Sequence, residues 1–89
     1  MTQVTILMGS ASDKPIAQKA EKILDKMNIT FETYVASAHR TPARVVEVIE
    51  NSSADVFIAL AGLSAALPGV VAAHTLKPVI GVPCASSSS

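Results

Sequence analysis

A histidine and an arginine stand side by side in the stretch VASAHRTPARV, residues 35–45. An imidazole can take and give a proton near neutral pH, and a guanidinium can bind a phosphate or carboxylate with paired hydrogen bonds. The stretch follows a run typical of a β-strand and precedes Pro42, a residue typical of the first turn of a helix. His39 is therefore a candidate general acid/base, and Arg40 is a candidate ligand for an anion.

Each of these two residues also has a purely structural interpretation. Arg40 could form a surface salt bridge, which contributes about 0–1 kcal/mol. A cation beside a helix start, however, is disfavoured by about 0.3–1 kcal/mol, because it meets the positive end of the helix dipole. A bound anion would remove this conflict and would favour the protonated form of His39, which suits acid/base chemistry. The alternative for His39 is a structural histidine that donates to a backbone carbonyl.

A second polar cluster follows the apolar run Val4–Met8. Ser12 or Asp13 can cap the next helix, and capping alone would account for both residues. Ser10 is not needed for capping in that case. A Gly-Ser-x-Ser loop before a helix offers backbone N–H groups and hydroxyls to an anion, so Ser10, Ser12 and Asp13 are candidate binding residues.

The remaining candidates follow the second and third apolar runs. Ser37 precedes the histidine, and Ala61 and Gly62 end the stretch ADVFIALAG. Small residues allow the backbone to approach a ligand closely, although packing against a helix would also explain them. In a parallel sheet the loops after the strands lie at one edge, where open α/β proteins bind ligands, so we expect all three loops to meet.

The alternation of short apolar runs with helical spacing predicts an α/β fold. Strands are expected in VTILM, ITFETYVA, ADVFIALAG and KPVIGVP, with ITFETYVA near a sheet edge because it alternates apolar and polar residues. Helices between them predict a parallel sheet covered on both faces. The first helix has Pro15 in its first turn, the second has Thr41 as its cap, and the third covers residues 63–76, with Pro68 near its start. The expected apolar faces are Ile16, Ala20, Ile23, Leu24 and Met27 in the first helix and Val45, Val46 and Ile49 in the second. In the third helix, Leu67, Val70, Val71 and His74 lie on adjacent turns.

Composition excludes several classes of protein. The 89 residues carry seven basic and seven acidic side chains, so no basic field predicts nucleic-acid binding. No apolar run approaches the roughly 20 residues of a membrane span, and the N-terminus lacks a signal peptide, so a cytoplasmic protein that does not bind membranes is expected. Cys84 has no partner at ligand spacing, and neither a metal site nor a cofactor is predicted. His74 is expected to be exposed or at an interface, and residues 86–89 to be a disordered or artificial serine tail after a domain of residues 1–85.

Four motifs in this order resemble the N5-carboxyaminoimidazole ribonucleotide mutase family, the PurE proteins of purine biosynthesis. They are MGSASD (8–13), SAHRTP (37–42), ALPGVVAAHT (66–75) and PVIGVP (78–83). The resemblance implies a flavodoxin-like three-layer fold, a homo-oligomer (an octamer in the family) and an aminoimidazole ribonucleotide substrate. It implies that Asp13 binds the ribose, that Arg40 and the serines bind the phosphate, and that His39 moves the proton, without metal, ATP or organic cofactor.

The resemblance covers Val4 to about Ser86 and corresponds to the front half of the family, so the fold is expected to be truncated after its fourth strand. Where the family usually has GGAAHLPG, this chain has GLSAALPG, which places Leu63 at a glycine position and Ala66 at a histidine position. Three functions follow from this interpretation: the mutase, a related carboxylase that uses free carbon dioxide, and a non-catalytic nucleotide-phosphate binder.

Overall fold

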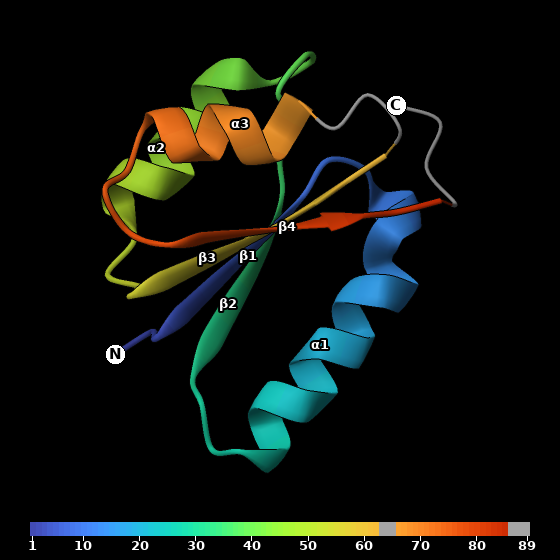
Figure 1. The fold of residues 1–89 in the computed structure, drawn as a ribbon, viewed down its shortest axis with the longest axis vertical. Coiled ribbons are helices and arrows are strands. Elements are labelled where there is room, and N and C mark those ends of the chain that lie inside the picture. The colour runs from blue at the N-terminus through green and yellow to red at the C-terminus, as the bar shows by residue number, and fades with distance from the viewer. Residues whose placement is uncertain (63–65, 86–89) are drawn as a thin grey trace.

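Four parallel strands form one sheet in the order β2-β1-β3-β4 in the computed structural model, which describes residues 1–62 and 66–85 (Figure 1). The strands are β1 (Val4–Met8), β2 (Phe31–Val35), β3 (Val56–Ala61) and β4 (Val79–Pro83). The helices are the 3-10 turn η1 (Ala11–Asp13), α1 (Lys14–Lys26), α2 (Pro42–Asn51) and α3 (Ala66–Ala73). The predicted parallel α/β fold is confirmed, and this strand order is that of the first four strands of a flavodoxin-like sheet.

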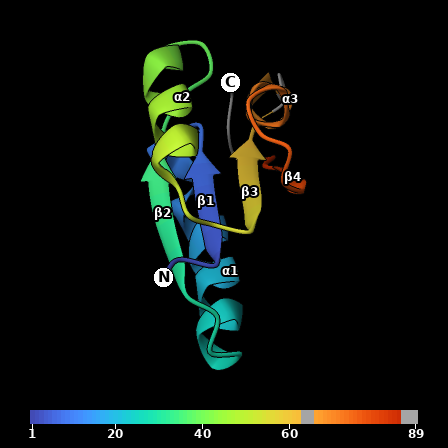
Figure 2. The same ribbon diagram turned by 90° about the vertical axis from the view of Figure 1, so that its left-hand side faces the viewer.

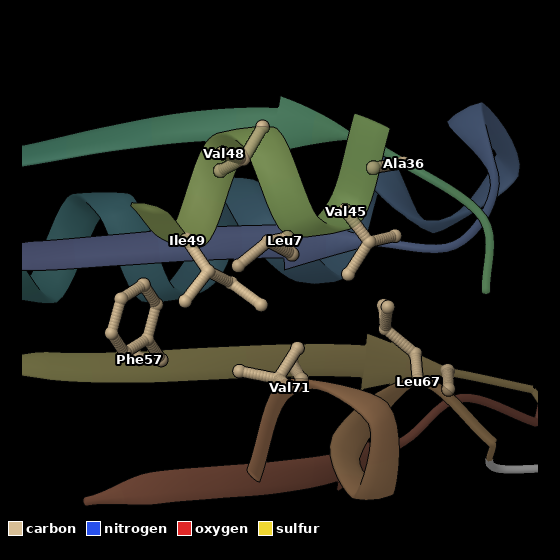
Figure 3. Close-up of a cluster of buried hydrophobic side chains, with 10 residues drawn as sticks. Leu7, Ala36, Val45, Val48, Ile49, Phe57, Leu67 and Val71 are labelled. Atoms are coloured by element: carbon tan, nitrogen blue, oxygen red, sulfur yellow. The ribbon is translucent and has the colours of Figure 1, made fainter. Parts of the chain in front are cut away.

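The sheet separates two apolar layers. Helices α2 and α3 cover one face, and α1 covers the other (Figures 1 and 2). Strands covered on both faces read as continuous apolar runs, and all five residues of β1 are buried. The layer under α2 and α3 is built from Leu7, Ala36, Val45, Val48, Ile49, Phe57, Ala59, Ala61, Leu67 and Val71 (Figure 3). The layer under α1 is built from Val4, Ile6, Met8, Ala17, Leu60 and Cys84.

The edge positions follow from the sequence pattern. Strand β2 lies at one edge, as its alternating pattern predicts, and Glu32 is exposed there. Strand β4 lies at the other edge and has no charged residue between Val79 and Pro83. Register pairs Ile58 of β3 with Ile80 of β4, so these two side chains point to the same face.

The positions predicted for the helix starts are confirmed, whereas the residues predicted to be buried need correction. Pro15 and Pro42 stand in the first turns of α1 and α2, as predicted. Pro68 lies in the first turn of α3, where a missing N–H group is tolerated. The stretch 63–65, which the sequence assigned to the third helix, and the serine tail 86–89 lie outside the described residues.

Two predicted stripes need correction. In α1 the buried residue is Ala17, whereas Ile23 and Met27 are 59% and 63% exposed. In α2 the buried stripe includes Val48, and Val46 is only half-buried. Sequence spacing predicts which residues share one face of a helix. It does not predict how much of that face the sheet covers. Here α1 extends past the part of the sheet that it packs on.

A Schellman motif ends α1. Asn28 has a left-handed backbone (φ 57°), its N–H donates to the Asp25 carbonyl at 3.1 Å, and the Ile29 N–H donates to the Leu24 carbonyl at 2.9 Å. Asparagine is the non-glycine residue best suited to this position. The motif turns the chain directly into β2.

Candidate functional site

The loops after β1, β2 and β3 meet at the carboxyl edge of the sheet. The Gly9 N–H donates to the Leu60 carbonyl at 3.0 Å, and the Ala36 N–H donates to the Met8 carbonyl at 2.9 Å. The loop after β1 is therefore bonded to both neighbouring strand ends. The predicted convergence of these loops is confirmed.

Two adjoining hollows lie at this edge. The first, here called the His39 hollow, has a volume of about 20 Å³. The second, here called the Arg40 hollow, has a volume of about 390 Å³. Gly9, Ser37, Ala38, His39, Ala61, Gly62, Ala66 and Leu67 line the His39 hollow. Gly9, Ser10, Ala11, Val35, Ala36, Ser37, Arg40 and Thr41 line the Arg40 hollow.

Gly9 and Ser37 line both hollows, so the two form one continuous surface. The Arg40 hollow is within the usual size range of small-ligand sites, whereas the His39 hollow has room for little more than a water molecule. Of the predicted residues, His39, Arg40, Ser10 and Ser37 are brought together here. Ala61 and Gly62 are also at the site, on the wall of the His39 hollow.

The turn that carries His39 and Arg40 is held by two hydroxyls. Ser37 Oγ accepts the backbone N–H groups of His39 (3.3 Å) and Arg40 (3.1 Å). Thr41 Oγ1 accepts the Ser37 N–H at 2.8 Å, and the Thr41 N–H donates to the Ser37 carbonyl at 2.9 Å. Thr41 stands at the N-cap of α2 as predicted, but its side chain bonds to Ser37 and makes no capping hydrogen bond to the helix. The residue types predict only the cap, and the Ser-x-x-x-Thr spacing is the signal that could have indicated the bond to Ser37.

The side chains of His39 and Arg40 are exposed and unengaged. Neither forms a hydrogen bond or ion pair with another residue in the ranges 1–62 and 66–85. Arg44, one turn further along, is different, because its guanidinium contacts Glu47 Oε1 at 2.9 Å and lies 5.7 Å from the centre of the Tyr34 ring. Arg40 therefore does not form the surface salt bridge considered as its structural role, whereas Arg44 forms one with Glu47.

In the loop after β1, the predicted capping residue is wrong: Ser10, and not Ser12 or Asp13, forms the capping hydrogen bond. Ser10 Oγ accepts the Ser12 N–H at 3.2 Å and lies 2.9 Å from Ser12 Oγ. Ser10 is therefore the residue that caps η1, whereas Asp13, at the N-cap of α1, makes no capping hydrogen bond. Ser12 is exposed and lines neither hollow. The choice of cap depends on the 3-10 turn, which the sequence pattern did not reveal.

Asp13 lies in the interior and not on either hollow. Its residue is 0% exposed, and neither carboxylate oxygen has a hydrogen-bond partner among the described residues. Cys84, 1% exposed, is beside it: burial of the thiol, and then the Asp13 carboxylate, raise the pKa of Cys84. Nothing in the local sequence signals this contact, because the two residues come from opposite ends of the chain.

The other predicted features lie apart from the site. His74 follows the end of α3 and is exposed, with Nδ1 2.9 Å from the Val70 carbonyl oxygen. No three His, Cys, Asp or Glu side chains of the described ranges gather as metal ligands. No helix in this part of the chain has the length and apolar character to cross a membrane.

A hollow of about 570 Å³, larger than the two at the carboxyl edge, lies along α1 and is lined by Phe31, Pro15 and polar or charged residues of that helix. None of its lining residues is a histidine or a serine, and none comes from the loops after β1, β2 and β3. The carboxyl edge remains the better candidate, because polar groups from three loops converge there on two side chains that have no other partner.

Fold and site together define the chain as a flavodoxin-like α/β domain whose carboxyl edge presents an exposed imidazole and an exposed guanidinium. The family model described as AIR carboxylase matches residues 3–89. The chain belongs to the AIR carboxylase family.

Curated relatives agree with this assignment. The N5-carboxyaminoimidazole ribonucleotide mutase of Methanocaldococcus jannaschii is 61% identical over 80 residues, which cover 90% of this chain and 51% of the relative. The mutase of Haemophilus influenzae is 48% identical over 88 residues, covering 96% of this chain and 54% of the relative. The crystal structure of Treponema denticola PurE superposes with a TM-score of 0.86 at 31% identity, over 94% of this chain and 56% of that one. The chain thus spans about half the length of these three relatives, and a quarter of the length of the mutase relatives from Methanobrevibacter smithii and Methanothermobacter thermautotrophicus.

Proposed function

We propose that this chain carries the substrate-binding and proton-transfer part of a mutase of purine biosynthesis, which converts N5-carboxyaminoimidazole ribonucleotide to 4-carboxy-5-aminoimidazole ribonucleotide. One observation carries the proposal: the unengaged imidazole and guanidinium of His39 and Arg40 stand on two adjoining hollows, in the loop that holds the family motif SAHRTP.

The nucleotide phosphate is assigned to the Arg40 hollow. Arg40 supplies a guanidinium that suits a phosphate, and Ser10 supplies a hydroxyl at the start of η1. Backbone N–H groups of the first turns of α1 and α2 favour negative charge at the same edge. An anion there also offsets the unfavourable position of a cation beside a helix start.

The reacting end of the substrate is assigned to the His39 hollow. Apart from Ser37 and His39, its lining residues are small or apolar: Gly9, Ala38, Ala61, Gly62, Ala66 and Leu67. Because this hollow is so small, the nucleotide lies in the Arg40 hollow and only the reacting atoms approach the imidazole.

The proposed reaction uses His39 in both directions. The bond between the exocyclic nitrogen and the carboxylate carbon breaks, carbon dioxide is released into the site, and the nitrogen takes a proton from the protonated imidazole. The ring carbon then attacks the carbon dioxide and forms the new carbon–carbon bond. The neutral imidazole removes the proton from that ring carbon, so the protonated histidine is restored and no net proton is exchanged.

Two residues differ from what the family resemblance implies. Ala66 lines the His39 hollow at the position where the resemblance expects a second histidine, so His39 is the imidazole of this hollow within the described residues. Asp13 lines neither hollow, and its assignment to the ribose rests on the family motif alone.

Growth of purine-requiring cells that lack the mutase tests the activity. We expect the chain to restore growth and His39→Asn to abolish it, whereas His74→Asn, which changes the exposed histidine after α3, leaves growth unchanged. Failure of the unmodified chain to restore growth, with folded protein present in the cells, would count against turnover by this chain.

Two alternative functions are each favoured by one observation. The family description names AIR carboxylase, which favours a carboxylase that takes free carbon dioxide. Kinetics with aminoimidazole ribonucleotide and bicarbonate, compared with N5-carboxyaminoimidazole ribonucleotide, separate it from the mutase. The half-length match favours a nucleotide-phosphate binder without turnover. Calorimetric binding of aminoimidazole ribonucleotide without product formation would assign that function.

A further inference from the structure

A second cation lies next to the Arg40 hollow. Helix α1 begins at Lys14 and runs back along the sheet from the carboxyl edge (Figure 2). Lys14 is exposed and lines a further hollow of about 290 Å³, here called the Lys14 hollow. Residues of α1, β1 and β2 form this hollow: Met8, Lys14, Ala17, Gln18, Glu21, Thr33 and Val35.

Val35 joins the Lys14 hollow to the Arg40 hollow, because this residue lines both. It is the last residue of β2, and 45% of it is exposed between the two hollows. Side chains of an α-helix lean toward the N-terminal end of the helix, which for α1 is the carboxyl edge of the sheet. A lysine in the first turn of α1 therefore leans toward the edge at which Arg40 lies.

The Lys14 ammonium has no counter-ion in the part of the chain that the structure describes. Glu21, the acidic residue of the Lys14 hollow, stands seven residues further on, roughly 10 Å along the helix axis. Its carboxylate accepts a hydrogen bond from the Thr33 hydroxyl at 2.5 Å. Asp13, the neighbour of Lys14 in sequence, is 0% exposed and forms no ion pair with it. Neither carboxylate therefore neutralises Lys14.

Lys14 and Arg40 both stand beside the start of a helix, where a cation is disfavoured. Neither α1 nor α2 has an acidic residue in its first turn to offset this, and no Asp or Glu of the described residues lines the Arg40 hollow. A phosphate monoester carries nearly two negative charges at pH 7, because its second pKa is about 6. Such a dianion would satisfy both cations, whereas Arg40 alone neutralises only half of its charge.

We propose that Lys14 is a second cation of the phosphate site and that, together with Arg40, it selects a ribonucleotide over the corresponding nucleoside. This role rests on the proposed function, which places the nucleotide phosphate in the Arg40 hollow. The planar guanidinium of Arg40 orients the phosphate, and the flexible ammonium of Lys14 adds the second charge. Lys14 directly follows MGSASD and lies outside the four family motifs, so the resemblance assigns it no role.

Calorimetry with aminoimidazole ribonucleotide compares Lys14→Gln with Lys19→Gln. The second variant loses the same charge from the same helix, but Lys19 lines the hollow beside Phe31 and not the Lys14 hollow. We expect Lys14→Gln to weaken binding about three- to tenfold, as for a charge-assisted contact at an exposed position. Lys19→Gln should weaken it less than about twofold, because salt screens a distant charge. Equal weakening by the two variants would overturn the role of Lys14.

Aminoimidazole riboside, which lacks the phosphate, locates the effect. We expect Lys14→Gln to leave riboside binding unchanged, and Lys14→Arg, which keeps the charge, to retain most of the ribonucleotide binding. An equal loss of riboside binding in Lys14→Gln would overturn the assignment to the phosphate. If Arg40→Ala weakens ribonucleotide binding and Lys14→Gln does not, the role of Lys14 is excluded and the proposed function stands. Failure of the folded, unmodified chain to bind the ribonucleotide would overturn both.

Discussion

Thr41 Oγ1 accepts the backbone N–H of Ser37 at 2.8 Å, and this bond closes the turn that presents His39 and Arg40. Replacing Thr41 by valine keeps the shape of the side chain but removes the hydroxyl and leaves the Ser37 N–H without its partner. We expect the free energy of unfolding to fall by about 1 kcal/mol, the usual net value of such a bond. Urea unfolding measures the loss.

Thr41→Ser is the control for this prediction, since it keeps the hydroxyl. It is expected to retain most of the lost stability. Amide exchange at Ser37 should accelerate in Thr41→Val and not in Thr41→Ser. Unchanged exchange in the valine variant would show that the bond does not hold the turn.

The sequence predicted the arrangement of the site better than its internal bonding. Strand and helix order follow from local periodicity, and parallel topology then places the loops after β1, β2 and β3 at one edge. The hydroxyl partners of Ser10 and Thr41 depend on backbone angles in short turns, which residue type alone does not set. The burial of Asp13 beside Cys84 depends on packing between the two ends of the chain, so no local pattern predicts it.

Arg40 and Arg44 offer a matched pair for testing the phosphate site. Arg40 is unengaged on the Arg40 hollow, whereas Arg44 contacts Glu47 and the Tyr34 ring. We expect Arg40→Ala to weaken binding of aminoimidazole ribonucleotide about 10- to 100-fold, the effect of losing a charge-assisted hydrogen bond. Arg44→Ala should change binding less than threefold. Calorimetry at two salt concentrations measures both, and equal losses in the two variants would reject the assignment.

Phe57 is the largest fully buried side chain and lies between the sheet and the helices of the α2 and α3 layer (Figure 3). Truncation to alanine leaves a cavity, and such changes cost about 3–5 kcal/mol. A domain of this size has only a small reserve of stability, so Phe57→Ala is expected to be largely unfolded by circular dichroism. Phe57→Leu, which keeps most of the volume, should remain folded. A folded, cooperative alanine variant would show that this layer does not dominate stability.

Asp13 is expected to limit stability, because its carboxylate is buried without a hydrogen-bond partner among the described residues. Asp13→Asn keeps the volume and removes the charge. We expect the free energy of unfolding to rise by roughly 1 kcal/mol or more, since desolvation of an unpartnered polar group exceeds the few tenths to 1 kcal/mol that a carboxylate gains at a helix start. Asp25→Asn, at an exposed position late in α1, is the control and should change stability little. A loss of stability in Asp13→Asn would mean that the carboxylate has a partner in solution.

Cys84 links pH to stability at the alkaline end. Burial, followed by the Asp13 carboxylate, raises the pKa of this thiol above its ordinary value of 9.0. Between the unfolded and the folded pKa, the unfolded chain loses the thiol proton while the folded chain keeps it. The contribution of Cys84 to stability is therefore fully present below pH 9 and is lost as the pH rises through the folded pKa.

Urea unfolding from pH 7 to 11 should show a decline in stability that is smaller in Cys84→Ala, measured relative to that variant's own value at pH 7. Tyr34→Phe controls for the tyrosine, whose pKa is also raised, chiefly by its hydrogen bond to Glu32. A decline of equal size in Cys84→Ala and in the unmodified chain would exclude the thiol as its source.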